Sequence, residues 1–128
     1  MPAIVTNKGR PLMAFGLMGW TMQPQAHVQF ITRVIDYCQN PQAALDARRW
    51  RIALEEPVIV LESGFNPDAS TGLARRGHQI VETEKKFILA RTPYGSAQMF
   101  GGGQMIYALD HGYVGASDHR RDGQVVGY

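Results

Sequence analysis

The first apolar segments of the chain are short and close together. Residues 3–6 and 12–15 flank the sequence NKGRP, which is rich in turn residues. This pattern is typical of a β-hairpin. Between residues 25 and 39 the apolar spacing changes to three- and four-residue steps, which predicts an amphipathic helix with Pro24 in its first turn. The apolar stripe of this helix comprises Val28, Ile31, Val34, Ile35 and Cys38.

Two further helices are predicted by their capping residues. Asn40 followed by Pro41 suits an N-cap and first helical position for the segment PQAALDA. Asn66 and Pro67 repeat this signature, and Gly77 then occupies a position typical of the residue after a helix.

The remaining apolar segments predict strands. PVIVLE, residues 57–62, is rich in β-branched residues and should form a buried strand. HQIVE, FILA, MIYAL and YVGAS are divided by glycines and predict a meander of short strands. The order of strands, helices and strands indicates an α+β layered fold, with antiparallel strands and two or three helices. We find no linker and treat residues 1–128 as a single segment.

Composition limits the function classes. The chain has 128 residues, is 45% hydrophobic and carries a net charge of +2, which suits one domain and predicts neither nucleic-acid nor membrane binding. No apolar run approaches the roughly 20 residues of a membrane span, and no signal-peptide pattern is present. As given, the chain is expected to be soluble and cytoplasmic, although a full-length parent could be periplasmic. The basic residues occur in pairs interpreted as solvated surface: Arg48/Arg49, Arg75/Arg76, Lys85/Lys86 and Arg120/Arg121.

Spacing alone identifies no metal or cofactor site. Cys38 is the only cysteine and is interpreted as a core residue, and the four histidines lack a zinc-binding spacing. His27 is interpreted as a hydrogen-bonded core histidine. A C-terminal group of charged residues around a glycine turn is interpreted as solvated rather than metal-binding: Asp110, His111, Asp118, His119 and Asp122. Neither a metal nor a cofactor is expected.

A local repeat lies before the last strands. GSAQMF at residues 95–100 is followed at once by GGGQMI at residues 101–106. The repeat is either a glycine-rich loop that enters a strand or a place where backbone approaches a ligand closely.

The sequence AFGLMGW places glycines between an apolar segment and a helix. A glycine-flanked loop that enters a helix N-terminus presents backbone N–H groups, which suit an anion or a developing oxyanion. This loop resembles the glycine loop of the gamma-glutamyltranspeptidase family, normally Gly-x-x-Gly-Gly before a helix. The resemblance continues through VIDYCQNPQAALDARRWR, GFNPDASTGLARRGHQI, FGGGQMI and the closing GASDHRRDGQVVGY. It covers nearly the whole chain in the right order.

The resemblance implies part of an N-terminal-nucleophile hydrolase, a four-layer αββα sandwich that cleaves its own precursor. In that family a new N-terminal threonine attacks a gamma-glutamyl amide such as glutathione, and the acyl group passes to water or to an amino acid. By position, Gly19 and Trp20 would supply the N–H groups of the oxyanion hole. Gly16, Gly102, Gly103 and Gln104 are weaker candidates for lining the substrate cleft.

Two departures from the family pattern shape the functional hypotheses. The threonine and its following strands are expected upstream of residues 2–6, so this sequence corresponds to the C-terminal part of the small subunit. Trp20 replaces a glycine, and it would be strained by about 1 to 2 kcal/mol if that position requires a positive φ. The loop is therefore altered or idle, or Trp20 is a lid on a hydrophobic edge.

Three functions remain open. The first is gamma-glutamyl transfer or hydrolysis, with the missing N-terminal segment or another copy as partner, the chain being inactive alone. The second is a non-catalytic remnant that acts as a binding or assembly module. The third is a separate enzyme that uses Pro2 as an N-terminal amine.

Overall fold

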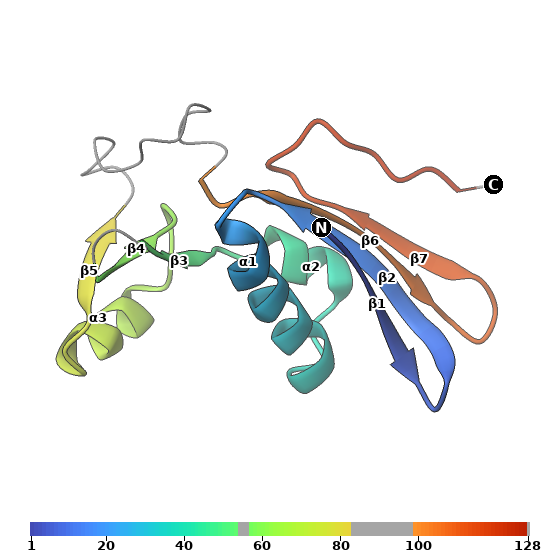
Figure 1. Cartoon of the computed structure of the whole chain (residues 1–128), viewed down its shortest axis with the longest axis horizontal. Coiled ribbons are helices and arrows are strands. Elements are labelled where there is room, and N and C mark those ends of the chain that lie inside the picture. Colours follow the sequence, from blue (N-terminus) through green and yellow to red (C-terminus); the bar gives the residue numbers. More distant parts are fainter. Residues whose placement is uncertain (54–56, 83–98, 128) are drawn as a thin grey trace. The chain divides into compact units, whose positions relative to one another are not determined.

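The computed structural model describes residues 1–53, 57–82 and 99–127. The chain divides into two compact units, Met1–Ala47 with Gly101–Tyr128, and Arg48–Phe100. Each unit has its own sheet and at least one helix (Figure 1).

The first unit is built on an antiparallel sheet. Its strands β1 (Pro2–Asn7), β2 (Arg10–Met18), β6 (Gly102–Ala108) and β7 (Tyr113–Ser117) lie in the order β1-β2-β6-β7. The predicted hairpin is confirmed as β1 and β2, and the last two predicted strands are confirmed as β6 and β7.

Helices cover one face of this sheet: α1 (Met22–Ile31), the π-helical turn η1 (Thr32–Asp36) and α2 (Pro41–Asp46) (Figure 1). Alternate residues of β2 point toward them, and Met13, Phe15 and Leu17 are buried. The ring of Phe15 lies 5.2 Å from that of Phe30 in α1. Burying such a side chain contributes about 1.5 to 3 kcal/mol, so this layer is the main core of the unit.

The first helix differs from its prediction. It begins at Met22 and ends at Ile31, and the chain continues as η1 only to Asp36. Val28 and Ile35 are exposed, whereas the buried positions follow a four-residue step: Met22, Ala26, Phe30 and Val34. Cys38 is exposed with φ +51, so its assignment to the core is wrong. It lies in the turn that must leave the helical conformation before α2 begins.

The second unit contains β3 (Trp50–Ile52), β4 (Val58–Leu61), α3 (Pro67–Arg75) and β5 (Gln79–Glu82). β3 pairs antiparallel with β4, whereas β4 pairs parallel with β5 across the connection that holds α3. The predicted meander is therefore wrong at HQIVE, because β5 joins this sheet rather than that of β6 and β7. FILA lies outside the described residues.

The predicted helix caps are confirmed in both units. Asn40 Oδ1 accepts from the N–H of Gln42 at 3.0 Å, and Asn66 Oδ1 accepts from the N–H of Asp68 at 2.8 Å. Gly77 follows α3 with φ +91, a conformation that residues other than glycine rarely adopt.

One prediction about the paired basic residues needs correction here. Arg49 is buried at 3% exposure and its Nη1 donates to the Phe100 carbonyl at 2.8 Å, so it is not solvated surface. Arg75 and Arg76 are exposed, as predicted. Lys85 and Lys86 lie outside the described residues.

Within the described ranges, no helix has the length and hydrophobicity that spanning a membrane requires.

Candidate functional site

The loop GLMGW connects β2 directly to α1. Gly19 has φ +132 and Trp20 has φ +53. The first turn of the helix then closes, because Met22 N–H donates to the Gly19 carbonyl at 2.9 Å and Gln23 N–H donates to the Trp20 carbonyl at 3.0 Å. The predicted passage from an apolar strand through a glycine loop into a helix N-terminus is confirmed.

The start of β6 holds this loop in place. A Cβ on Gly19 would lie 2.9 Å from Gly101 Cα, and a Cβ on Gly101 would lie 2.1 Å from the Met18 carbonyl oxygen. Both distances are shorter than real Cβ contacts allow. Glycine is therefore needed at both positions, and the loop is interlocked with the backbone of Gly101, directly before β6.

Trp20 has the positive φ at which a tryptophan backbone is strained. Its φ of +53 lies in the left-handed region, which costs a residue with a Cβ about 1 to 2 kcal/mol. The residue is 72% exposed. An indole that covered a hydrophobic edge of this chain would lose most of that exposure, so the lid interpretation does not fit.

Asp118 joins β6 to the segment after β7, and it is fully buried. Its Oδ2 accepts from the N–H of Gly103 at 3.0 Å, and its Oδ1 accepts from Arg120 Nη1 at 3.1 Å. The other contacts of Arg120 fix α2, because its Nη1 and Nη2 donate to the carbonyls of Leu45 and Ala47 at 2.9 and 3.0 Å. The interpretation of Asp118 and Arg120 as solvated residues is therefore wrong.

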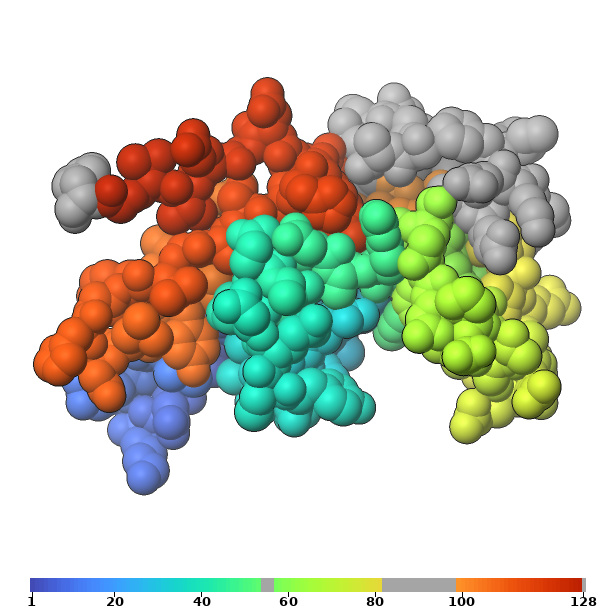
Figure 2. All heavy atoms as spheres, turned by 180° about the vertical axis from the view of Figure 1, so that it is seen from behind, coloured from blue at the N-terminus to red at the C-terminus, as the bar shows by residue number. Residues whose placement is uncertain are grey.

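The segment after β7 thus ties two elements to the site. Figure 2 shows it in red directly against the teal helix α2. Because Gly103 is two residues beyond Gly101, the Asp118 carboxylate also fixes the backbone that supports the Gly19–Trp20 loop. Sequence reasoning missed this role, because a charged residue beside a glycine turn carries no sign of burial.

The other candidate site residues divide between the two faces of the sheet. Gly16 lies opposite Gln104 in the pairing of β2 with β6, on the face away from the helices. With Gly102 they line a groove of about 960 Å³ on that face. Gly103 also lines this groove, but a side chain there would point toward the core, because a Cβ would lie 2.8 Å from Leu45 Cδ2.

The C-terminal tail comprises residues 119–127, and its residues 121–125 form one wall of this groove. Gln104 Nε2 donates to Ser117 Oγ at 2.9 Å, and a Cβ on Gly123 would lie 2.5 Å from the same nitrogen. Gln104 therefore contacts β7 and the tail. Met18 lines the groove, and Gly19 and Trp20 follow it in the chain just beyond the lining.

His27 lies under the end of β2. Its ring is 4.9 Å from that of Phe15, its Nε2 accepts from Leu17 N–H at 3.3 Å, and the Met1 carbonyl lies 3.1 Å from the same nitrogen. Burial lowers the pKa of His27 and outweighs the opposing effect of the Met1 carbonyl. The prediction of a hydrogen-bonded histidine is confirmed, although the side chain is only half-buried.

No metal centre is formed by the part of the chain that the structure describes, where no three His, Cys, Asp or Glu side chains converge. His119 and Asp46 form a pair instead, with Nδ1 and Oδ1 3.0 Å apart. Burial alone would raise the pKa of Asp46, but hydrogen bonds from Gln42 and His119 lower it overall.

Comparison with known proteins places this geometry in context. The sequence matches the family model for gamma-glutamyltranspeptidase over residues 1–128. It is 31% identical to the glutathione hydrolase-like YwrD proenzyme of Bacillus subtilis (strain 168) over 99% of the chain. The match covers only 23% of that relative's length.

Solved structures agree on the fold. A cephalosporin acylase from Bacillus halodurans matches with a TM-score of 0.84 and 36% identity, over 99% of this chain and 22% of its own. A gamma-glutamyltranspeptidase from Pseudomonas nitroreducens matches with a TM-score of 0.75 and 21% identity, over 100% of this chain and 60% of its own. At that identity the second match shows the fold alone.

Proposed function

The chain belongs to the gamma-glutamyltranspeptidase family, and from that premise we propose that it forms part of an enzyme that transfers gamma-glutamyl groups to water or to an amino acid. The observation that supports this proposal best is the Gly19–Trp20 loop, which enters the N-terminus of α1 and is interlocked with Gly101. Backbone N–H groups at such a position suit the negative charge of a tetrahedral intermediate.

In the proposed reaction a threonine from outside this chain supplies the nucleophile. Its Oγ attacks the γ-carbonyl carbon, its α-amine accepts the hydroxyl proton, and the carbonyl oxygen becomes an oxyanion. Collapse of the intermediate breaks the C–N bond, and the amine leaves with the proton. Water or an acceptor amine then attacks the acyl ester and releases the threonine.

The contribution of this chain is oxyanion stabilisation. The N–H groups of Gly19 and Trp20 would donate to the oxyanion, and Asp118 would hold the supporting glycine backbone rigid. The loss of one such donor typically costs about 3 kcal/mol of barrier, so small changes of loop geometry should alter kcat.

The open face of the first sheet is the proposed surface for the rest of the enzyme. Ile4, Met18 and Ile106 are 71%, 47% and 51% exposed on this face. Contiguous exposed apolar side chains mark surfaces that another layer covers. A second β layer that carries the threonine would complete the αββα arrangement there.

A non-catalytic binding or assembly module is the second candidate, and Trp20 favours it. A glycine at this position would accept φ +53 without strain, whereas Trp20 is strained and presents an exposed indole next to the proposed oxyanion position. Such a residue suits contact with a partner better than turnover.

Complementation tests both candidates. The purified chain is mixed with the upstream part of the Bacillus subtilis relative, processed to expose its threonine, and release of 4-nitroaniline from gamma-glutamyl-4-nitroanilide is followed. Turnover by the mixture, but by neither part alone, supports the enzyme. Association of the two parts without turnover favours the binding module, and turnover by the chain alone contradicts the role of an external threonine.

A further inference from the structure

His27 joins the two ends of the Gly19–Trp20 loop. Its Nε2 accepts from the N–H of Leu17, which lies in β2 just before the loop. The chain leaves β2 through the loop, enters α1 and meets β2 again at this hydrogen bond. A bond across both ends of a loop restricts the backbone between them, so His27 helps to determine where the N–H groups of the loop point.

The contacts of His27 lie in the layer between the sheet and the helices. Its ring centroid is 4.9 Å from that of Phe15, whose side chain is buried. Leu17, the hydrogen-bond donor, is only 1% exposed. A buried N–H that loses its acceptor costs free energy, so the end of β2 depends on the state of the imidazole.

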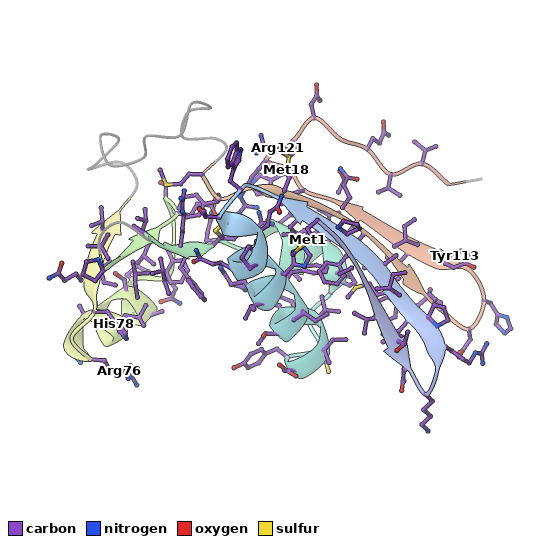
Figure 3. All side chains as sticks on the ribbon, in the orientation of Figure 1. Met1, Met18, Arg76, His78, Tyr113 and Arg121 are labelled. Carbon is purple, nitrogen blue, oxygen red and sulfur yellow. The ribbon has the colours of Figure 1, made fainter. Side chains whose placement is uncertain are left out.

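The same nitrogen also faces the first residue of the chain. The Met1 carbonyl oxygen lies 3.1 Å from His27 Nε2, and the Met1 ammonium donates to the Leu17 carbonyl at 3.2 Å. In an antiparallel pair the reciprocal bond would run from the Leu17 N–H to the Met1 carbonyl, and Nε2 is within reach of both groups. Figure 3 shows Met1 beside α1, at the end of the sheet where β2 reaches Met18.

One imidazole nitrogen cannot serve both groups at once. Nε2 accepts from Leu17 only while it carries no proton, so the neutral ring holds its proton on Nδ1. A second proton binds at Nε2, and the resulting N–H donates to the Met1 carbonyl and repels the Leu17 N–H. Protonation therefore exchanges one hydrogen bond for the other, and the end of β2 loses its acceptor.

Few charged groups surround this ring in the described part of the chain. α1 contains no other titratable residue. The neighbouring elements carry the Met1 ammonium, Arg10 at the far end of β2, and Arg33 and Asp36 in η1. Burial is the main cause that lowers the pKa of His27, and of these charges the ammonium alone adds to it. The neutral ring that accepts from β2 is therefore favoured near neutral pH.

We propose that His27 is a positioning residue, which holds the Gly19–Trp20 loop in place through the Leu17 N–H and releases it when Nε2 takes up a proton. The inference rests on the proposed function and deepens it, because the N–H groups of this loop are those that would bind the oxyanion. Gly19 and Trp20 carry no titrating group of their own, so His27 supplies the pH dependence of the loop. The loop is in position at neutral pH and displaced in acid.

Amide NMR of the 128-residue chain tests this coupling without any turnover. The amide signals of Leu17, Gly19 and Trp20 are followed as the pH is lowered, together with the ring nitrogen signals of His27. We expect the amide signals to move in one transition that has the midpoint of the ring, below pH 6.5. Above that pH the ring nitrogens should show the proton on Nδ1.

Matched variants separate titration from hydrogen bonding. His27→Gln offers an acceptor and a donor that do not titrate, so the loop signals should lose the transition. His27→Leu removes the acceptor, and above pH 6.5 its Leu17 amide should exchange with solvent about five times faster than in His27→Gln. His111→Gln makes the same change at an exposed histidine between β6 and β7 and should leave the transition unchanged. Circular dichroism spectra establish that each variant is folded.

Loop signals that do not follow the protonation of His27, or a transition that persists in His27→Gln, would overturn the inference. A neutral ring with its proton on Nε2 would overturn it as well, because that nitrogen could not accept from Leu17.

Turnover by the reconstituted mixture tests the consequence for the reaction. The ratio of kcat in the wild type to kcat in His27→Gln should fall at least about fivefold as His27 takes up its proton, since the two proteins share every other ionisation. A ratio that is constant with pH would overturn the positioning role and leave the proposed function standing. Loop signals that follow His27 in a mixture without turnover would contradict the proposed function alone.

Discussion

Gly103 and Asp118 bind each other twice. The Gly103 N–H donates to the Asp118 carboxylate at 3.0 Å, and the Asp118 N–H donates to the Gly103 carbonyl at 3.0 Å. Because Asp118 also pairs with Arg120, a single buried carboxylate links β6, the segment after β7 and α2.

Removal of this carboxylate should destabilise the first unit strongly. Asp118→Ala leaves Arg120, whose side chain is 7% exposed, without its counter-charge. Breaking a buried pair in this way typically costs about 3 to 5 kcal/mol of unfolding free energy. Urea unfolding measures the change. The unfolding free energy of Asp110→Ala, a change at an exposed position, should stay within about 0.5 kcal/mol of the wild-type value. Equal losses in the two variants would contradict the role of Asp118 in linking β6, the segment after β7 and α2.

The interlock between Gly19 and Gly101 predicts a difference between two glycine variants of the same unit. Gly101 and Gly112 have φ of +71 and +100, so alanine is strained by about 1 to 2 kcal/mol at either. Only at Gly101 would the new Cβ also meet backbone, at 2.1 Å, whereas Gly112 has nothing within 4 Å. We expect Gly101→Ala to lower the unfolding free energy by at least about 1 kcal/mol more than Gly112→Ala. Similar losses of unfolding free energy in the two variants would show that the loop shifts to accommodate the new Cβ at Gly101.

Backbone strain at Trp20 is measurable without an assay. Trp20→Ala keeps a Cβ at φ +53, whereas Trp20→Gly removes it, and both variants lose the indole. The glycine variant should therefore be more stable than the alanine variant by about 1 kcal/mol in urea unfolding. A more stable alanine variant would show that the positive φ carries no strain.

The lowered pKa of His27 predicts a pH dependence of stability. Burial holds this pKa below its ordinary value of 6.5, so the unfolded chain takes up the proton first as the pH falls. The stabilising effect is complete above pH 6.5 and is lost as the pH falls from there toward the folded-state pKa. Urea midpoints between about pH 8 and about pH 5 should fall more in the wild type than in His27→Gln. Parallel curves for the two proteins would contradict this assignment.

Local chemistry explains which parts of the fold were predictable. The Asn40 and Asn66 caps need only the N–H groups of the residues that follow them, so sequence alone identifies them. The parallel pairing of β4 with β5 depends on how the connection through α3 folds back, which the apolar pattern of QIVE does not encode. Cys38 fits the periodic pattern, but the need to turn toward α2 ends the helix before it.

The candidate site divides in the same way. The Gly19 loop was predictable because glycines between a strand and a helix have a local meaning. Its contact with Gly101 and the burial of Asp118 depend on segments that are distant in sequence, and single residue types give no sign of them. Arg121 has the same residue type as Arg120, and only the structure shows that Arg120 binds Asp118 and α2.

The most direct measurement is turnover by a chimera in which this chain replaces the matching C-terminal part of the Bacillus subtilis relative. Release of 4-nitroaniline from gamma-glutamyl-4-nitroanilide is measured for the chimera, for its threonine-to-alanine variant and for its Trp20→Gly variant, with the parent enzyme in parallel. Threonine-dependent turnover, increased by Trp20→Gly, is the expected result. A folded and processed chimera that stays inactive with tryptophan and with glycine at position 20, beside an active parent, would contradict a catalytic role for the Gly19–Trp20 loop.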